Sequence, residues 1–294
     1  MHSLMRVVVT GAAGLIGGIV HDHLADRGHR MTGVDRPLDD WLASGRNTED
    51  TRAPGRVDAH LDLADAAIES ICAVLEGCEV LVHLAADANP DNDDDSMLRN
   101  NVRASTVLLR AARESGVRRV IVASSGLAQV GLEDLFGDEG PFHGQRIGVV
   151  HGVAPTSLYG ISKIFAEQLA EMYARVNGME MIAVRIGTVM PDESEHWSRG
   201  GRLQATAFLR ADVERFFERA IEADISAWRP SDFPGHPNTS GFLLTAAQSD
   251  PPGRFVDLEP GLTALGWSPI EWPNEPPDGT PDDASGASSS RPPR

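Results

Sequence analysis

Residues 6–18 read Arg-Val-Val-Val-Thr-Gly-Ala-Ala-Gly-Leu-Ile-Gly-Gly, and this stretch predicts the fold of the whole chain. The β-branched run at its start is typical of a buried parallel strand, and glycines follow it directly. Residues 15–27 then have the pattern of a helix, and residues 30–34 form a second predicted strand that ends at Asp35. A strand, a glycine-rich turn, a helix and an acid after the next strand are typical of a dinucleotide-binding unit.

Each glycine of this turn has its own role in such a unit. Gly11 allows the tight turn, Gly14 lets the backbone approach a pyrophosphate, and Gly17 lets the helix pack against the strand. The amides of the first helical turn then face the phosphates at the positive end of the helix dipole. Asp35, eighteen residues after Gly17, is placed to accept hydrogen bonds from the adenosine ribose. Its charge repels a 2′-phosphate, so we expect NAD rather than NADP, and Arg36 weakens that preference without reversing it.

The alternative is that the glycine-rich segment is only a turn. A lone glycine pattern leaves that alternative open, whereas here the strand, the helix and the acid all stand at the required positions. The glycines are three residues apart at both steps. This spacing resembles that of short-chain and extended short-chain dehydrogenases/reductases, which predicts a Tyr-x-x-x-Lys motif further along the chain.

Length and composition indicate one large α/β unit. The chain has 294 residues, of which 41% are hydrophobic, enough for a well-packed core. We expect a Rossmann-type doubly wound parallel sheet with a small C-terminal substrate lobe. The NAD-binding core would span residues 1–187 and the lobe residues 188–271, with a helix at 211–223 packing back on the core. Residues 272–294 are rich in Pro, Gly, Ser and Asp and are predicted to be disordered.

Charge and cysteine content exclude several classes of partner. The formal net charge of -17 argues against binding to nucleic acid or to an anionic membrane. No apolar run approaches the roughly 20 residues of a membrane span, and the start of the chain does not resemble a secretory signal. We therefore expect a cytoplasmic protein. Cys72 and Cys78 are expected to be unpaired, and the acidic run at 91–95 to complement a helix dipole; no metal site is expected.

The hydrophobic pattern predicts alternating strands and helices along the remainder of the chain. Further strands are predicted at residues 57–61, 79–84, 119–123, 181–185 and 241–246, and further helices at residues 65–75, 96–115, 157–177 and 211–223. Loops are predicted at residues 36–56, 127–155 and 192–201.

The segment Tyr159-Gly-Ile-Ser-Lys163 lies in the predicted helix at residues 157–177. Residues four apart share one helix face, so the phenol and the ammonium group point into the same cleft. A tyrosine with its usual pKa of about 10 is a poor acid or base at neutral pH, but a nearby cation favours the phenolate. Ser125, at the end of a predicted strand, can hydrogen-bond the reacting oxygen. The alternative is a surface helix with a half-buried tyrosine.

We therefore expect Ser125, Tyr159 and Lys163 to be catalytic. Tyr159 would act as acid or base and Ser125 as its hydrogen-bond partner, so both would also contact the substrate. Lys163 would favour the phenolate and hold the nicotinamide ribose. The reaction would be hydride transfer between NAD and an alcohol.

The chain resembles the extended short-chain dehydrogenases/reductases of the NAD-dependent epimerase/dehydratase family over about residues 5–270. The matching stretches are Thr10-Gly-Ala-Ala-Gly-Leu-Ile-Gly17, Asp62-Leu63, His83-Leu-Ala-Ala86, Asn101-Val102, Val122-Ala-Ser-Ser125, Tyr159-Gly-Ile-Ser-Lys163 and Arg185-Ile-Gly187. The resemblance implies that further cofactor-binding residues are Leu15, Ile16, Asp62, Leu63, Leu84, Ala85, Ala86, Asn101 and Ile186.

Within that family, the chain is most similar to the uronate dehydrogenase-like and sugar-dehydrogenase branch. Arg202 falls where this branch places an arginine that binds the substrate carboxylate, so the resemblance implies that it contacts the substrate. Uronate dehydrogenases follow the catalytic serine with Asn-His, whereas this chain has Gly126-Leu127, and its loop before Tyr159 is longer. The Asp-Glu pair of sugar-nucleotide dehydratases is also replaced. The substrate is therefore left open.

Three functions follow from these features. The first is an NAD-dependent oxidoreductase that acts on a secondary or anomeric hydroxyl of a sugar, a sugar acid or a similar small molecule. The alternative enzyme is a sugar (nucleotide) epimerase with tightly bound NAD. A nucleotide-sensing regulator on the same fold is a third possibility, although such proteins commonly lose the tyrosine or lysine that this chain retains.

The predicted helices at residues 96–115 and 157–177 carry apolar residues on more than one face, so each packs on two sides. One explanation is that both are fully buried in a monomer. The resemblance instead favours a homodimer that pairs these helices in a four-helix bundle.

Overall fold

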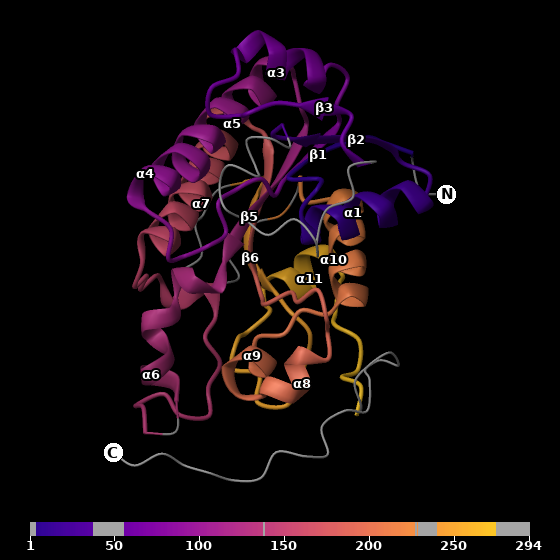
Figure 1. The fold of residues 1–294 in the computed structure, drawn as a ribbon. Helices are drawn as coiled ribbons and strands as arrows, with labels where there is room; N and C mark the ends of the chain where they lie inside the picture. The colour runs from indigo at the N-terminus through magenta and orange to yellow at the C-terminus, as the bar shows by residue number, and fades with distance from the viewer. Residues whose placement is uncertain (1–3, 38–55, 138, 227, 229–239, 275–294) are drawn as a thin grey trace.

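A seven-stranded parallel sheet forms the centre of the molecule (Figure 1). The computed structural model describes residues 4–37, 56–137, 139–226, 228 and 240–274. The strands are β1 (Arg6–Thr10), β2 (Arg30–Asp35), β3 (Ala59–His60), β4 (Val80–His83), β5 (Arg119–Ser125), β6 (Glu180–Ile186) and β7 (Phe242–Ala247). Their order is β3-β2-β1-β4-β5-β6-β7, and every neighbouring pair is parallel. This order confirms the predicted doubly wound sheet.

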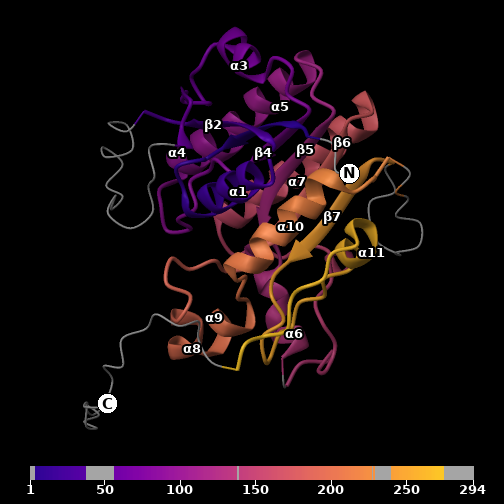
Figure 2. The same cartoon turned by 90° about the vertical axis from the view of Figure 1, so that its right-hand side faces the viewer.

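Helices cover both faces of the sheet (Figure 2). The α-helices of the described residues are α1 (Leu15–Asp26), α3 (Ile68–Leu75), α4 (Asp94–Met97), α5 (Ala104–Glu114), α6 (Glu133–Phe136), α7 (Leu158–Asn177), α8 (Glu195–Arg199), α9 (Gly201–Ala205), α10 (Arg210–Glu222) and α11 (Gly261–Leu265). α1 and α10 pack together on one face, and α3, α5 and α7 on the other. Alternate residues of β1 enter opposite cores, with Val8 in one cluster and Val7 and Val9 in the other.

The turn between β1 and α1 is closed by its glycines. Gly11 has a φ of +74°, which residues with side chains rarely adopt, and its amide donates to the Val34 carbonyl at 2.8 Å. A Cβ atom on Gly17 would lie 2.0 Å from the carbonyl oxygen of Gly11. The helix therefore begins so close to the strand that no side chain fits at Gly17, and its N-terminus opens at the carboxyl end of β1.

The helix predicted at residues 96–115 is confirmed as a continuous helical run from Asp94 to Glu114, but its second turn is π-helical, which the prediction did not include. α4 is followed by a π-helical turn at Leu98–Arg103 and then by α5. The wide turn presents Asn101, whose Oδ1 accepts from the amide of Asp87 at 2.7 Å and whose Nδ2 donates to Ser162 Oγ at 2.9 Å. Asn101 thus ties the turn to the segment after β4 and to α7. π-helical turns of this kind are frequent at functional sites.

Two of the predicted loops contain helical turns. The predicted loop at 127–155 contains α6 and the 3-10 turns Val130–Leu132 and Val149–His151, and it overlaps a third 3-10 turn at Gly126–Ala128; α8 lies within residues 192–201. These elements are too short to show a 3.6-residue period in the sequence. The predicted loop at 36–56 falls largely outside the described residues.

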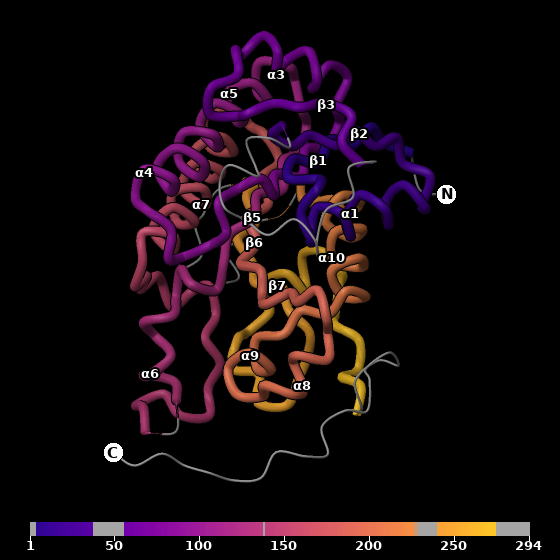
Figure 3. Tube along the Cα trace, viewed as in Figure 1, coloured from indigo at the N-terminus to yellow at the C-terminus, as the bar shows by residue number. Residues whose placement is uncertain are grey.

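The part of the chain after β6 is not separated from the sheet. β7 pairs with β6, and α10 packs against α1. α8 and α9 lie with α6 at the lower end of the molecule, as the tube in Figure 3 and the turned view in Figure 2 both show. Trp272, the first residue of the tail predicted to be disordered, stacks on Trp197 with ring centroids 4.6 Å apart, and residues 275–294 of that tail lie outside the described residues.

Both cysteines are free, Cys78 buried and Cys72 partly so. In the described part of the chain, no helix combines the length and apolar character that a membrane crossing requires.

Candidate active site

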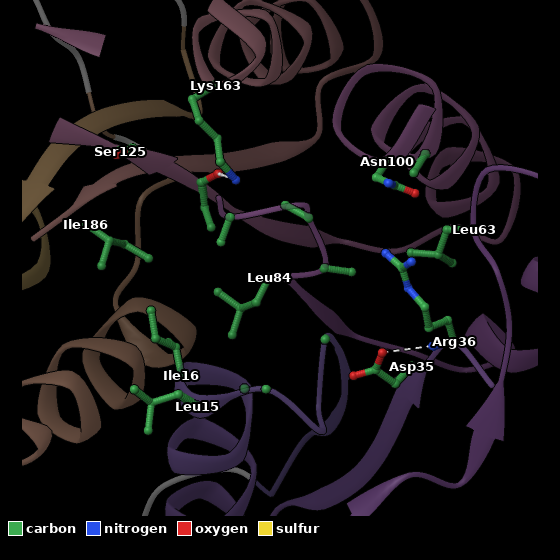
Figure 4. A pocket seen from close by; sticks show the side chains of 18 of the residues that line it. Leu15, Ile16, Asp35, Arg36, Leu63, Leu84, Asn100, Ser125, Lys163 and Ile186 are labelled. Carbon is green, nitrogen blue, oxygen red and sulfur yellow. Dashed lines mark hydrogen bonds between the residues drawn. The ribbon is translucent and has the colours of Figure 1, made fainter. Parts of the chain in front are cut away.

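A cavity of about 520 Å³ opens at the carboxyl ends of the central strands (Figure 4). It lies where β1 and β4 are neighbours and the strand order changes direction, which is where open α/β sheets bind ligands. Sixteen residues expected at the cofactor or at the chemistry line it: Gly11, Gly14, Leu15, Ile16, Gly17, Asp35, Arg36, Asp62, Leu63, Leu84, Ala85, Ala86, Ser125, Tyr159, Lys163 and Ile186. The cavity thus brings together segments spread over most of the first 190 residues.

Asp35 lies at the end of β2 and faces this cavity. Its Oδ2 accepts from the amide of Ala13 at 3.0 Å, and its Oδ1 accepts from the amide of Arg36 at 2.8 Å. These two bonds fix the carboxylate between the glycine-rich turn and β2. Each carboxylate oxygen keeps a further lone pair, so Asp35 can still accept hydrogen bonds from a pair of hydroxyls.

Asp62 lines the same cavity but is already paired. Its Oδ2 accepts from Arg99 Nη2 at 2.8 Å, and its Oδ1 caps the amide of Ala64 at 3.0 Å. Arg99, which lies in the π-helical turn, also forms an ion pair with Asp65. The two acids therefore tie that turn to the segment after β3, beside the part of the cavity that Leu63 lines.

Asn101 is placed differently from the other expected cofactor residues. Its side chain is buried behind the cavity, and its neighbour Asn100 lines the cavity instead. The hydrogen bonds of Asn101 to Asp87 and Ser162 give it a positioning role, because Ser162 lies between Tyr159 and Lys163 on α7. The matching stretch Asn101-Val102 thus lies in a turn that borders the cavity, but Asn100 rather than Asn101 lines it.

Helix α7 carries the tyrosine and the lysine to the end of β5. Ser157 caps the helix, its Oγ accepting from the amide of Gly160 at 3.2 Å. A Cβ atom at Gly160 would lie 2.7 Å from the carbonyl oxygen of Leu127, so the absence of a side chain lets the helix approach the segment after Ser125. Lys163 Nζ donates to the carbonyl of Ala123 at 3.3 Å and lies 5.5 Å from the Tyr159 ring centroid.

Burial shifts both titratable groups of the motif. It raises the pKa of Tyr159, and a side-chain hydrogen bond with Ser125 opposes part of that rise. Burial lowers the pKa of Lys163 to about 8, although the charge of Asp87 acts in the opposite direction. A lysine cation near neutral pH stands beside a phenol, so the pair suits a proton transfer that passes through the phenolate.

A second cavity, of about 350 Å³, adjoins the first. The two share six lining residues, among them Ser125 and Tyr159; the others are Ala88, Ile186, Gly187 and Val189. The second cavity extends away from the glycine-rich turn toward α6 and α9, which contribute Glu133 and Arg202. Molecules held in the two cavities would therefore meet at the serine and the tyrosine.

Arg202, expected at the substrate, lines this second cavity and is paired with Glu133. Its Nε donates to Glu133 Oε1 at 3.1 Å and to Oε2 at 2.9 Å, and its Nη2 donates to Oε1 at 2.8 Å. No local pattern indicates this partner, because Glu133 stands 69 residues away in a segment predicted as a loop.

A second arginine, Arg185, also lines this cavity, and the sequence did not indicate it as a site residue. It lies at the end of β6 and is buried. Its Nε and Nη2 donate to Glu167 of α7 at 2.7 and 2.8 Å, and its Nη1 has no hydrogen-bond partner among the described residues. The only signal in the sequence was its position in the Arg185-Ile-Gly187 stretch.

The chain is similar to known proteins over most of its length. The sequence model of the NAD dependent epimerase/dehydratase family matches residues 7–229. The L-arabinose 1-dehydrogenase (NAD(P)(+)) of Haloferax volcanii is 27% identical over 275 residues, with 90% of this chain and 96% of that protein covered. The uronate dehydrogenase of Agrobacterium fabrum is 30% identical, with 76% and 74% covered.

Among solved structures, a mutant of the uronate dehydrogenase from Agrobacterium tumefaciens complexed with NAD is similar to this chain. The TM-score is 0.66 at 26% identity, with 92% of this chain and 86% of that chain covered.

Proposed function

We propose that this chain, which belongs to the NAD-dependent epimerase/dehydratase family, transfers a hydride between NAD and a secondary or anomeric hydroxyl of a sugar, a sugar acid or a similar small molecule. The observation that carries this proposal is the meeting of two cavities at Ser125 and Tyr159. One cavity has the glycine-rich turn and the acid of a dinucleotide site, and the other has the size and polar lining for a small substrate.

The residues present fit NAD in the first cavity. The close approach at Gly11 and Gly17 leaves the amides at the start of α1 facing the cavity, where a pyrophosphate would bind. Asp35 would accept hydrogen bonds from the adenosine ribose, and Lys163 would hold the nicotinamide ribose. When bound, NAD supplies the hydride acceptor at its nicotinamide ring.

The chain's own residues would move the proton. Tyr159, as phenolate, would take the proton of the substrate hydroxyl while a hydride leaves the carbon that carries this hydroxyl. Ser125 would hydrogen-bond the reacting oxygen of the substrate. Ser125 and Tyr159 both line the two cavities, so this oxygen would lie where the cavities meet. Lys163 would favour the phenolate through its charge, which is largely present at pH 7 because the pKa of Lys163 is about 8.

We also propose a division of labour along the chain: residues 1–187 bind NAD, and residues 188–271 complete the substrate cavity. A homodimer is proposed through the face of α7 and the π-helical turn. This face exposes large apolar side chains, namely Leu98, Ile161, Met172 and Val176. A cytoplasmic location is proposed from the two free cysteines and the net charge of -17.

The test is a panel of sugars, uronic acids and polyols incubated with NAD and followed at the NADH absorbance. The proposal expects at least one member to be oxidised with one NADH released per molecule of product. Turnover of a sugar to its epimer without released NADH would instead identify an epimerase. Binding of NAD with no turnover of any member would favour the regulator.

A further inference from the structure

The lining of the second cavity carries information about the charge of the substrate. Only three of its described lining residues are charged: Glu133, Arg185 and Arg202. Both arginines have a carboxylate partner, Arg202 in Glu133 and Arg185 in Glu167. The cavity therefore presents no cation without a counter-charge. Its other polar residues are neutral hydroxyl and amide groups, namely Ser125, Gln129, Tyr159, Thr188, Thr206 and Gln248.

Glu133 and Arg202 form a bidentate ion pair. Three hydrogen bonds of 2.8–3.1 Å join the guanidinium to both carboxylate oxygens. The two side chains are only partly exposed, 44% for Arg202 and 25% for Glu133. A carboxylate or phosphate arriving at Arg202 would have to displace Glu133 or bind beside it, and like charges at such a distance repel.

The pair also joins two segments that are far apart in the sequence. Glu133 is the first residue of α6, in the long segment between β5 and α7, whereas Arg202 lies on α9. Next to Ser125, the cavity wall has no side chain at Gly126, where an added Cβ atom would meet no described atom within 4 Å. The segment between β5 and α7 thus supplies the carboxylate of Glu133, which neutralises Arg202. Its Gly126 leaves space beside Ser125.

We propose that the substrate is an uncharged sugar rather than a uronate or a sugar phosphate, and that Glu133 sets this preference by neutralising Arg202. The inference rests on the proposed function. Hydroxyl groups of a neutral sugar can hydrogen-bond the carboxylate of Glu133 and the neutral groups of the wall without displacing an ion pair. In the oxidation, the C–H hydride passes to NAD and the O–H proton to Tyr159, so a hemiacetal becomes a lactone.

The experiment compares sugars that differ only in charge. D-glucose and D-galactose are each paired with their C6 carboxylates, D-glucuronate and D-galacturonate, and D-glucose also with its 6-phosphate. kcat/KM is measured with NAD for the wild type, for Glu133→Gln, and for Glu195→Gln as control. Glu195 forms an ion pair with Arg199 on α8, and neither residue lines the cavity, so the control makes the same change of net charge nearby.

We expect the wild type to favour the neutral member of a pair by at least about tenfold in kcat/KM. Glu133→Gln should shift this ratio toward the acid by a similar factor, mainly through a lower KM for the acid, while Glu195→Gln leaves it unchanged. A wild-type preference for an acid or a phosphate overturns the inference, as does an equal shift in both variants or none in Glu133→Gln.

Failure of the proposed function has a different signature. If no variant reduces NAD with any sugar, charged or neutral, while NAD still binds, the oxidoreductase proposal itself is wrong. Oxidation of the acids in preference to the neutral sugars would leave that proposal standing and remove only the role of Glu133.

Discussion

Replacing Glu167 by glutamine should destabilise the protein far more than removing an exposed ion pair. Glu167 and Arg185 are 1% and 3% exposed, and two hydrogen bonds of 2.7 and 2.8 Å join them. Ser124 Oγ also donates to Glu167 Oε1 at 2.5 Å, so one carboxylate holds α7 against both β5 and β6. α7 carries the tyrosine and the lysine of the candidate site.

The magnitude follows from the burial of the pair. Removing one partner leaves the other charge buried without compensation, which costs about 3–5 kcal/mol. For a domain of this size that loss lowers the melting temperature by on the order of 10 °C. The Glu195–Arg199 pair is 29% and 64% exposed, so Glu195→Gln should cost about 0.5 kcal/mol or less.

Urea unfolding followed by circular dichroism measures both variants. A double variant, Glu167→Met with Arg185→Met, removes both charges and should be less destabilised than either single replacement. If Glu167→Gln unfolds within 1 kcal/mol of Glu195→Gln, or if the double variant is the least stable of the set, the buried pair does not hold α7 in the way described.

Three further predictions follow from the site. Tyr159→Phe should lower kcat by about 10²–10⁴-fold because it removes the acid/base group, while the dissociation constant of NAD measured by fluorescence changes less than threefold; equal losses in both would contradict the assigned role. Lys163→Met should abolish activity and yet stabilise the ligand-free protein at pH 7 by up to about 3 kcal/mol, since burial lowers the pKa of Lys163 to about 8 and the buried charge costs most below that pH. The advantage of Lys163→Met over the wild type should shrink as the pH rises from 8 toward the unfolded pKa of about 10.4. Equal melting temperatures of the two proteins at pH 7, or a difference that does not shrink at higher pH, would contradict this prediction. Gly17→Ala should lose NAD binding in a titration, because its Cβ would lie 2.0 Å from the Gly11 carbonyl oxygen, whereas Gly126→Ala, with nothing within 4 Å, should bind NAD like the wild type.

The sequence predicted the first cavity better than the second. The glycine-rich turn, Asp35 and the Tyr159–Lys163 spacing are local patterns whose geometry a helix or a strand imposes, so these residues could be placed from the sequence. The same patterns predicted the parallel sheet and most of its elements. Asn101, which the resemblance placed at the cofactor, is instead buried behind the cavity, and Asn100 of the same π-helical turn lines it.

The second cavity depends on contacts between residues far apart in the chain. Nothing in the local pattern around Glu133 indicates that it meets Arg202, and nothing around Arg185 indicates Glu167. The resemblance placed Arg202 at the substrate, whereas its charge in the structure is already neutralised. Substrate preference is a property of such pairings, which is why the sequence left it open.

Direct hydride transfer can be followed with a sugar deuterated at the carbon that is oxidised. The wild-type protein is incubated with NAD and this sugar, and the released cofactor is analysed by mass spectrometry. We predict one deuterium per molecule of released NADH, carried on the nicotinamide ring, in an amount equal to the oxidised product. Deuterium that returns to the sugar with no labelled NADH released, or that exchanges with solvent, would contradict the assignment of this chain as an NAD-dependent dehydrogenase.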